Sequence, residues 1–550
     1  MRDAPNHDSP SLETVLDYHQ DTKHHFQRYA RGPGDLDWAT QPDPFRRYQG
    51  APVVALQKTQ PQARPLYDEA FAPDGVPPRP ISFESISELF YHSLALSAWK
   101  TTGEHRWALR VNPSSGNLHP TEGYLITGPV EGLCQVPVVC HYTAREHALE
   151  TRARLEIPLW EELCRRIPGA YLFIALTSIH WREAWKYGQR AYRYCQHDVG
   201  HALGAIAVAA AGMGWKTWMV DDLSTHDLSW LTGTFFQHDA EPEEPDLLIA
   251  IAPGGERKDD SSPTRGDLHA FASLEWLGTP NPLSPHNLDW DIDPVATACR
   301  RPRGPANYQQ VAVAGAKSNY PARPVSLAQV IAQRRSAVEM DGTTRISRET
   351  FYRILLKTLP CPGRPPFNTL PWKPHIHLAI FVHRVVDLAS GLYLLVRDPS
   401  KQPTLEAAIV QGATWREPPG CPEGLRLFQL IEGDLREKAK QVSCFQGIAG
   451  DGCFSLAMIA EYETPIQRYG PCFYPRLFWE AGLIGQVLYL EAEAAGIRST
   501  GIGCYFDDAM HEFLGLQDHA FQDLYHFTVG GAVEDIRLTT LPPYPEASAD

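Results

Sequence analysis

The chain has 550 residues, of which 43% are hydrophobic and 10% aromatic, so it can bury more than one core and should contain more than one domain. Its formal net charge of −15 and pI near 5.8, with no cluster of Lys and Arg, argue against a nucleic-acid or membrane surface as the main partner. No apolar stretch approaches about 18 residues, and residues 1–10 lack the apolar core of a signal peptide, so we expect a cytoplasmic protein.

The first half of the chain predicts an N-terminal extension followed by an alternation of helices and strands. Residues 1–75 contain one short helical pattern, and a helix should begin at Ser82 and carry apolar residues as far as Leu96. Further elements are predicted in this order: strands near 124–127, 136–142 and 171–176, an apolar helix over 199–211, and a strand over 247–252. Residues 256–320, rich in Pro, Asp, Ser and Asn, predict a linker.

The second half repeats this order. A helix begins at Ser347, strands follow near 378–382, 392–396 and 454–460, and an apolar helix ends at Gly496. The glycine spacing repeats as well: 14 residues separate Gly200 from Gly214 and Gly482 from Gly496. We therefore predict a tandem duplication of one domain of about 200 residues.

The duplication predicts a fold class and domain limits. Each copy should be α/β or α+β, a mixed sheet flanked by helices, and the two copies should pack as an intramolecular pseudo-dimer that can oligomerise further. The predicted parts are an extension over 1–78, a first domain over 79–256, a linker over 257–322 and a second domain over 323–545.

A loop between two prolines, Pro113 and Pro120, has the composition of a ligand-binding segment. It offers the hydroxyls of Ser114 and Ser115, a glycine and the Asn117 amide, while the prolines fix two backbone angles. The same composition also fits a surface turn.

Three motifs together resemble the nitroreductase family, in particular its SagB/ThcOx-type branch, the azoline dehydrogenases. The stretch 110–122, Arg-Val-Asn-Pro-Ser-Ser-Gly-Asn-Leu-His-Pro-Thr-Glu, is similar to the flavin loop of that branch. Residues 333–336, Gln-Arg-Arg-Ser, are similar to the phosphate motif of the family's first helix. Residues 186–188, Lys-Tyr-Gly, are similar to a segment of the azoline dehydrogenases.

The resemblance implies a bacterial flavoprotein with FMN bound non-covalently between two copies of the domain, one supplying the phosphate motif and the other the loop. In this chain, each copy has only one of these two motifs. Aligning Ser82 with Ser347 places Glu69, Ala70 and Phe71 opposite the Arg-Arg-Ser motif, and the second copy has residues 366–369, Pro-Phe-Asn-Thr, where the loop belongs. We therefore expect one FMN per chain, in a groove between the halves.

The resemblance assigns the cofactor contacts to three segments. Arg334 and Arg335 suit a phosphate dianion because guanidinium groups donate paired, charge-assisted hydrogen bonds, and Ser336 adds a hydroxyl. Val338 stands where the family usually has another basic residue, and Arg537 is the expected replacement. The remaining contacts to the ring and ribityl chain are expected from Pro113, Ser114, Ser115, Asn117, Gly501, Ile502 and Gly503. The alternatives are an exposed basic helix turn and a glycine turn without a ligand.

Lys186 and Tyr187 are the candidate catalytic residues. Hydride removal from a carbon next to a heteroatom is easier when a base takes the partner proton, and a partly desolvated Lys beside a Tyr can do this. The resemblance thus points to oxidation of a small-molecule or peptide-derived azoline-like substrate. The alternatives are NAD(P)H-dependent reduction of nitro or quinone compounds, a non-catalytic binding protein with a vestigial flavin site, or a Lys-Tyr pair that only packs.

Metal and disulfide chemistry receive less support. His197 and His201 have a spacing that can bind zinc, but Asp198 between them matches Glu480 in a copy without these histidines, so we expect no metal site. The eleven cysteines include no Cys-x-x-Cys pair and fit reduced, mostly buried thiols better than a disulfide framework.

Overall fold

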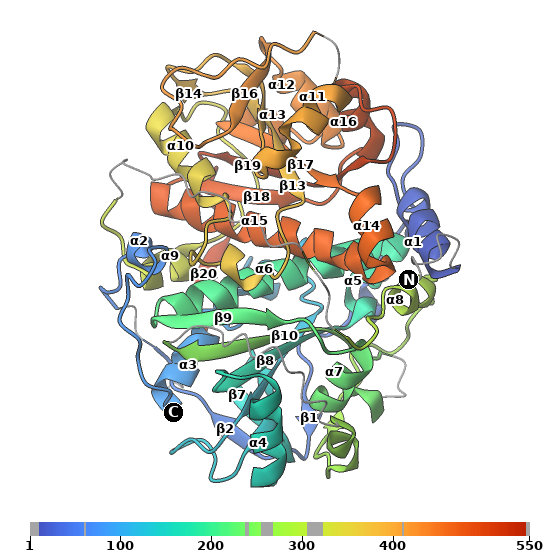
Figure 1. The fold of residues 1–550 in the computed structure, drawn as a ribbon, viewed down its shortest axis with the longest axis vertical. Coiled ribbons are helices and arrows are strands. Elements are labelled where there is room, and N and C mark those ends of the chain that lie inside the picture. The colour runs from blue at the N-terminus through green and yellow to red at the C-terminus, as the bar shows by residue number, and fades with distance from the viewer. Residues whose placement is uncertain are drawn as a thin grey trace, which may run out of the picture.

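The protein contains two large antiparallel sheets, one from each half of the chain (Figure 1). The structure is a computed structural model that describes residues 10–59, 62–236, 241–254, 268–304, 308, 323–409 and 412–545. The first sheet has the order β2 (Val53–Ala55), β7 (Ala148–Arg154), β6 (Val138–Thr143), β5 (Thr121–Thr127), β8 (Leu172–Ser178), β10 (Glu244–Pro253) and β9 (Trp215–Val220). Residues of the central strands β5 and β8 are buried throughout, because helices and loops cover both faces.

The second sheet repeats the strand order of the first. It runs β16 (Leu427–Glu432), β15 (Gly391–Leu395), β13 (Ile376–Val382), β17 (Phe454–Glu461), β19 (Phe521–Gly530) and β18 (Arg498–Ile502). Counted along the chain within each half and without β2, both sheets therefore have the order 3-2-1-4-6-5. This shared topology confirms the predicted α+β fold with two similar domains.

We expected each sheet to contain both parallel and antiparallel strand pairs. In the described part of the chain, every strand pair within the two large sheets is instead antiparallel. In each half a long helix carries the chain from the fourth strand to the far edge of the sheet. The last strand, β10 or β19, then returns between its two neighbours and runs antiparallel to both.

Two long helices, α6 (Ala191–Ala211) and α15 (Tyr474–Ala495), lie against each other between the sheets (Figure 1). They cross at Gly200 and Gly482, the glycines that the repeat spacing matches. A Cβ on Gly200 would collide with the carbonyl oxygen of Trp479, and one on Gly482 with that of His197. Glycine at both positions thus allows the close backbone approach that joins the two halves.

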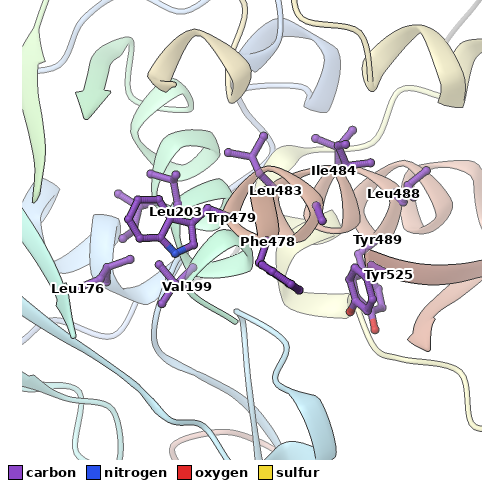
Figure 2. Close-up of a cluster of buried hydrophobic side chains, with 14 of the residues drawn as sticks. Leu176, Val199, Leu203, Phe478, Trp479, Leu483, Ile484, Leu488, Tyr489 and Tyr525 are labelled. Atoms are coloured by element: carbon purple, nitrogen blue, oxygen red, sulfur yellow. The ribbon is translucent and has the colours of Figure 1, made fainter. Parts of the chain in front are cut away.

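The interface between these helices is part of one hydrophobic core that runs through both halves. Figure 2 shows Val199 and Leu203 of α6 beside Trp479 and Leu483 of α15, and all four side chains are buried. Burial of this kind is the main favourable term in folding, so the shared core stabilises the contact between the halves, while each half also has a further core cluster of its own. The halves therefore pack as the predicted pseudo-dimer.

Each end of the chain crosses to the opposite half. The helix α1 (Pro10–Asp21) leads to Lys23, whose Nζ lies 2.7 Å from Oδ1 of Asp508 in the second half. At the other end, β20 (Thr539–Leu541) pairs with β3 (Leu96–Thr101), which also pairs with β4 (Arg106–Arg110) in the first half.

The other elements are short and connect or cover the sheets. The helices are α2 (Tyr67–Ala70), α3 (Phe83–Tyr91), α4 (Ile157–Arg166), α5 (His180–Tyr187), α7 (Thr225–Thr232), α8 (Asp293–Ala298), α9 (Leu327–Gln333), α10 (Arg348–Lys357), α11 (Gln402–Ala408), α12 (Arg436–Val442), α13 (Ile448–Asp451), α14 (Glu463–Tyr469) and α16 (Asp507–Leu514). The strands are β1 (Tyr48–Gln49), β11 (Thr279–Pro280), β12 (Ile346–Ser347) and β14 (Val385–Val386).

Several boundaries differ from the sequence prediction. Ser82 caps α3 as predicted, with its hydroxyl accepting from the Ser85 amide, but the helix ends at Tyr91 because Leu96 begins β3. The helix α6 begins at Ala191, well before the predicted 199. Within the predicted linker, residues 268–304 contain β11 and α8, and residues 257–267, 305–307 and 309–322 lie outside the described part. None of the described helices is long and apolar enough to span a membrane.

Candidate functional site

A cavity of about 880 Å³ lies between the two halves, and both contribute to its wall. This volume falls within the range of about 300–1,000 Å³ that ligand pockets usually have. The first half supplies the Pro113–Asn117 loop and α6, and the second half supplies the segment after α9, one side chain of α15 and the end of β18. Predicted residues that line it are Pro113, Ser114, Ser115, Asn117, Tyr187, Arg334, Arg335, Ser336, Gly501, Ile502 and Gly503.

The Pro113–Asn117 loop is held in shape by its own polar groups. The Ser114 hydroxyl accepts a hydrogen bond of 2.7 Å from the His119 amide, and the Asn117 side-chain amide donates to the Ala108 carbonyl at 2.8 Å. Gly116 has a φ of +60°, a conformation that glycine adopts without strain. We expected these polar side chains to contact a ligand, whereas the structure uses part of their capacity to fix the loop.

Two buried carboxyl groups, those of Asp198 and Glu183, accept hydrogen bonds from the loop and hold it in place. Asp198 of α6 accepts hydrogen bonds from the Ser115 amide at 3.1 Å and from the Ser115 hydroxyl at 3.3 Å. Glu183 of α5 accepts from the Ser114 hydroxyl at 3.4 Å. Burial raises the pKa of Asp198 to about 7, and burial together with the neighbouring Asp198 raises the pKa of Glu183 well above its usual range. Both carboxyl groups therefore keep a proton to a higher pH than an exposed carboxyl group does.

Lys186 and Tyr187 end α5 next to this loop. A Cβ on Gly116 would lie 2.6 Å from the Tyr187 hydroxyl and 3.2 Å from the Lys186 Nζ, so both polar groups reach the same point of the loop. The Tyr187 ring lies 4.5 Å from the Tyr194 ring, centroid to centroid. Burial raises the pKa of Tyr187 well above its usual value, so its hydroxyl stays protonated at neutral pH. Lys186 itself is half-buried and reaches the loop without lining the cavity.

Opposite the loop, two arginines follow the short helix α9. Arg334 is buried and donates to the Arg110 carbonyl at 3.0 Å, while its Nε and Nη1 have no hydrogen-bond partner among the described residues. Arg335 donates to the Ser97 carbonyl at 2.8 Å. Burial lowers the pKa of Arg334 to about 10, and burial together with Arg334 lowers the pKa of Arg335 to about 9. Neither arginine forms an ion pair with any residue that the structure describes, so together they make a site for an anion.

Further polar residues around these arginines were not predicted from the sequence. Arg498 at the start of β18 also lines the cavity, and burial lowers its pKa. The Tyr489 hydroxyl of α15 is hydrogen-bonded to the Ser336 hydroxyl at 2.9 Å and accepts from the Gly501 amide at 3.0 Å. The Tyr489 hydroxyl thereby connects the Arg334–Ser336 motif to Gly501 of β18. Tyr489 and Ser336 belong to the same half but lie 153 residues apart along the chain, so no local motif in the sequence marked the tyrosine.

Gly501 and Gly503 leave room on the cavity wall. A Cβ on Gly501 would collide with the Tyr525 hydroxyl, and one on Gly503 would lie 2.5 Å from the Tyr194 ring. Both tyrosines line the cavity, so the glycines let β18 approach the wall closely. Ile502 lies between them with a buried side chain.

Arg537 lies apart from the other predicted cofactor residues. Its side chain is 83% exposed and forms an ion pair of 2.7 Å with Asp535. Asp535 lines the cavity but Arg537 does not, and the arginines that line it are Arg110, Arg334, Arg335 and Arg498.

Across the pseudo-twofold, the segments that match the cavity motifs carry other residues. The Tyr67 amide donates to the Val325 carbonyl and the Leu327 amide to the Pro65 carbonyl, so α2 matches α9 with Tyr67 opposite Leu327. This pairing corrects the sequence alignment, because it places residues 74–76, not 69–71, opposite Arg334–Ser336. The buried Phe71 ring, just after α2, has the Lys357 Nζ 4.3 Å from its centroid. Thr369, in the segment that replaces the loop, forms a hydrogen bond of 2.7 Å with Thr217 of β9. The position of Gly501 is taken on β9 by the buried side chain of Met219.

The two histidines with zinc-like spacing pack against an aromatic ring. His197 stacks on Tyr525 at 4.1 Å between centroids, and the His201 Nε2 lies 3.2 Å from the Tyr525 hydroxyl. Among the described residues, no three His, Cys, Asp or Glu side chains are grouped as metal ligands.

Comparison with known proteins relates both the sequence and the fold to one family. Residues 422–531 match the model of the nitroreductase family. A solved structure from Anabaena variabilis, described as that of a nitroreductase, is 21% identical, has a TM-score of 0.66, and matches over 94% of this chain and 99% of that chain. Since its TM-score exceeds 0.5, it shows that nearly the whole chain shares that fold.

Two other solved structures are less similar. A Ralstonia eutropha protein described as a nitroreductase is 15% identical over 41% of this chain and 97% of that chain, with a TM-score of 0.28. The Escherichia coli microcin synthetase McbBCD complex with truncated pro-MccB17 bound is 16% identical over 46% of this chain and 96% of that chain, with a TM-score of 0.26. No curated protein sequence matches the chain significantly.

Proposed function

Because residues 422–531 belong to the nitroreductase family, we propose that the chain is an FMN-dependent oxidoreductase with one flavin site, in the cavity between its halves. The observation that carries this proposal is the pairing inside one cavity of the Pro113–Asn117 loop from the first half with Arg334 and Arg335 from the second. Across the pseudo-twofold, the corresponding segments contain neither the Ser-Ser-Gly-Asn loop nor an Arg-Arg-Ser motif, and the buried Met219 stands where the second half has Gly501, which supports one FMN per chain.

The residues at one end of the cavity suit a phosphate group. Arg334 has two guanidinium nitrogens without a partner among the described residues, and Arg335 adds positive charge. Arg498 also lines the cavity, although it forms an ion pair with Glu493. A phosphate dianion bound there would accept charge-assisted hydrogen bonds and would neutralise the buried cations. Ser336 would add a hydroxyl donor.

The residues at the other end suit a flat ring. Gly116, Gly501 and Gly503 add no side chain to the cavity walls at three positions, and Tyr194 and Tyr525 give the cavity an aromatic surface. Bound there, FMN would supply a two-electron acceptor at its N5 atom.

The proton chemistry would be carried out by the chain's own residues at the end of α5. We assign Lys186 Nζ the role of taking the proton that leaves the substrate when hydride is removed. The Tyr187 hydroxyl, which stays protonated at neutral pH, would donate a hydrogen bond to the reacting group. Glu183 and Asp198, whose pKa values are both raised by burial, would hold protons beneath the loop.

We propose a small heterocyclic or peptide-derived substrate of the azoline type, because Tyr187 lines the cavity and the Lys186 Nζ reaches the loop beside it, a pair that suits oxidation coupled to proton removal. The second candidate is NAD(P)H-dependent reduction of nitro or quinone compounds, which the family match of residues 422–531 favours.

Anaerobic mixing of the FMN-loaded chain with substrate distinguishes these functions. An azoline-containing peptide that bleaches the flavin absorbance, with NADPH inactive, supports the dehydrogenase. Bleaching by NADPH, followed by reoxidation with a nitroarene or quinone, supports the reductase instead. A purified chain that neither contains nor takes up FMN contradicts both and leaves a non-catalytic binding protein.

A further inference from the structure

Two cysteines lie in direct contact beside the cavity. The sulfur atoms of Cys444 and Cys504 are 2.8 Å apart, although 60 residues separate them along the chain. All eleven cysteines lie in the described part of the chain, and this is the one sulfur–sulfur contact among them. Cys444 follows α12, and Cys504 directly follows Gly503 and lines the cavity.

The backbone around Cys444 is bent so that its side chain meets Cys504. Cys444 and Phe445 have φ angles of +54° and +59°, a left-handed conformation that non-glycine residues adopt only with backbone strain. Gln446 holds this turn, because its side-chain amide donates to the Cys504 carbonyl at 2.8 Å and to the Ser443 carbonyl at 3.0 Å. The strained turn and its clamp thus keep two sulfurs together that the sequence places far apart.

The surroundings favour a thiolate at Cys504. Its sulfur is hydrogen-bonded to Cys444 and to His24, and the Arg190 guanidinium adds a favourable charge, so that its pKa is lowered to about 5. The His24 Nδ1 accepts a hydrogen bond of 2.9 Å from the Ala30 amide, which leaves the other ring nitrogen to serve the sulfur. The Cys444 pKa is raised by its hydrogen bond to Cys504 and by burial. A thiolate beside a thiol is the arrangement from which disulfides form and exchange.

We propose that Cys444 and Cys504 are a redox-active dithiol–disulfide pair that exchanges two electrons with the flavin of the adjoining cavity. The electron exchange rests on the proposed function, whereas formation of the disulfide does not. In the oxidative direction, the S–H bond of Cys444 breaks and an S–S bond forms. The two electrons pass to the isoalloxazine ring of FMN, which takes up the Cys444 proton and one proton from solvent.

This pair gives the site a second two-electron centre. Cys504 is the sulfur that faces the cavity, and Cys444 is the resolving thiol that closes the disulfide. Electrons from substrate oxidation could then leave the flavin by reduction of the disulfide, and an external disulfide of the glutathione class would reoxidise the dithiol.

The first test uses the ligand-free full-length chain. It is equilibrated in buffers of different reduced-to-oxidised glutathione ratios, alkylated and digested, and the cysteine peptides are identified by mass spectrometry. We expect a reversible Cys444–Cys504 disulfide, while Cys361, a partly exposed cysteine elsewhere, is not linked to another cysteine. Reduced Cys444 and Cys504 at every ratio overturn the proposal, whether or not FMN binds.

The second test counts electrons in the FMN-loaded chain by anaerobic titration with dithionite. The oxidised wild type should take up two electrons for the flavin and two for the disulfide. Cys444→Ser and Cys504→Ser should each take up only the two flavin electrons, and Cys361→Ser should behave as the wild type. Independent of any variant, a wild type that takes up two electrons in total overturns the pair. A chain that forms the disulfide but binds no FMN overturns the electron exchange together with the proposed function.

Discussion

Replacing Arg334 with Met is expected to stabilise the ligand-free protein and to weaken FMN binding. Burial lowers the pKa of Arg334 from 12.5 to about 10, which corresponds to about 3 kcal/mol of unfavourable free energy for holding the charge without an anion. The Met variant avoids this cost but loses the hydrogen bond to the Arg110 carbonyl, worth about 1 kcal/mol. The free energy of unfolding of the ligand-free protein should therefore rise by about 2 kcal/mol.

The same substitution removes the donors that a phosphate would use. Two nitrogens of Arg334 are without a partner among the described residues, and each hydrogen bond to a charged group contributes about 1.5–3 kcal/mol. Loss of two such bonds costs about 4 kcal/mol, which weakens the dissociation constant of FMN by roughly 10³-fold. The opposite signs of the two effects distinguish a ligand-binding arginine from a structural one.

Urea unfolding of the ligand-free protein and fluorescence titration with FMN measure the two effects. Arg397→Met is the matched control, because Arg397 is equally buried but forms an ion pair with Glu480. This control should destabilise the protein by about 3–5 kcal/mol and leave FMN affinity unchanged if the variant folds. A less stable ligand-free Arg334→Met variant, or one with wild-type FMN affinity, would refute the reasoning.

Three further substitutions test other parts of the site. Lys186→Met should lower turnover by about 10²–10⁴-fold with FMN content unchanged, whereas Arg468→Met at the matching place in the second half should change neither, as steady-state kinetics will show. Burial raises the pKa of Asp198 from 3.8 to about 7. Between these two pH values the folded protein binds a proton that the unfolded chain does not, so the stability of the wild type falls as pH rises through this range. Asp198→Asn should make that slope shallower in urea unfolding, because Glu183, whose pKa is also raised, still contributes to it, and an unchanged slope would exclude the assignment. Gly116→Ala and Gly103→Ala each replace a glycine with positive φ, but only the Cβ at Gly116 has polar side chains within 4 Å, so only Gly116→Ala should reduce FMN affinity in a binding titration.

The duplication could be predicted from the sequence because the fold demands glycine at fixed places. Gly200 and Gly482 mark the crossing of α6 and α15, where a side chain would collide with the opposite backbone. Gly496 ends α15 with a φ of +78°. The antiparallel order of each sheet could not be predicted, because hydrophobic patterns locate strands but do not say which strand inserts between which.

The candidate site could be predicted only where its chemistry is local in sequence. The loop at Ser114 and the pair Arg334–Arg335 were visible as motifs, and the structure brings them to one cavity. Tyr489 and Glu183 were missed because each meets the site through packing of helices far apart in the chain.

Two predictions from the sequence concern residues whose surroundings only the structure defines. Arg537 was chosen for its charge, yet Asp535 lies close enough in the same turn to bind it at the surface. The cysteines were expected to be separate reduced thiols, because 60 residues of chain hide the contact between Cys444 and Cys504. Spacing along the chain cannot report such a pair.

The number of FMN molecules bound per chain tests the central claim most directly. The purified protein is denatured, and the released flavin is quantified against protein concentration. The single composite site predicts about one FMN per chain, lost in Ser115→Leu and Arg334→Glu and retained in Glu69→Ala. Two FMN per chain would contradict the single composite site, and a chain that binds none would contradict the proposed enzyme.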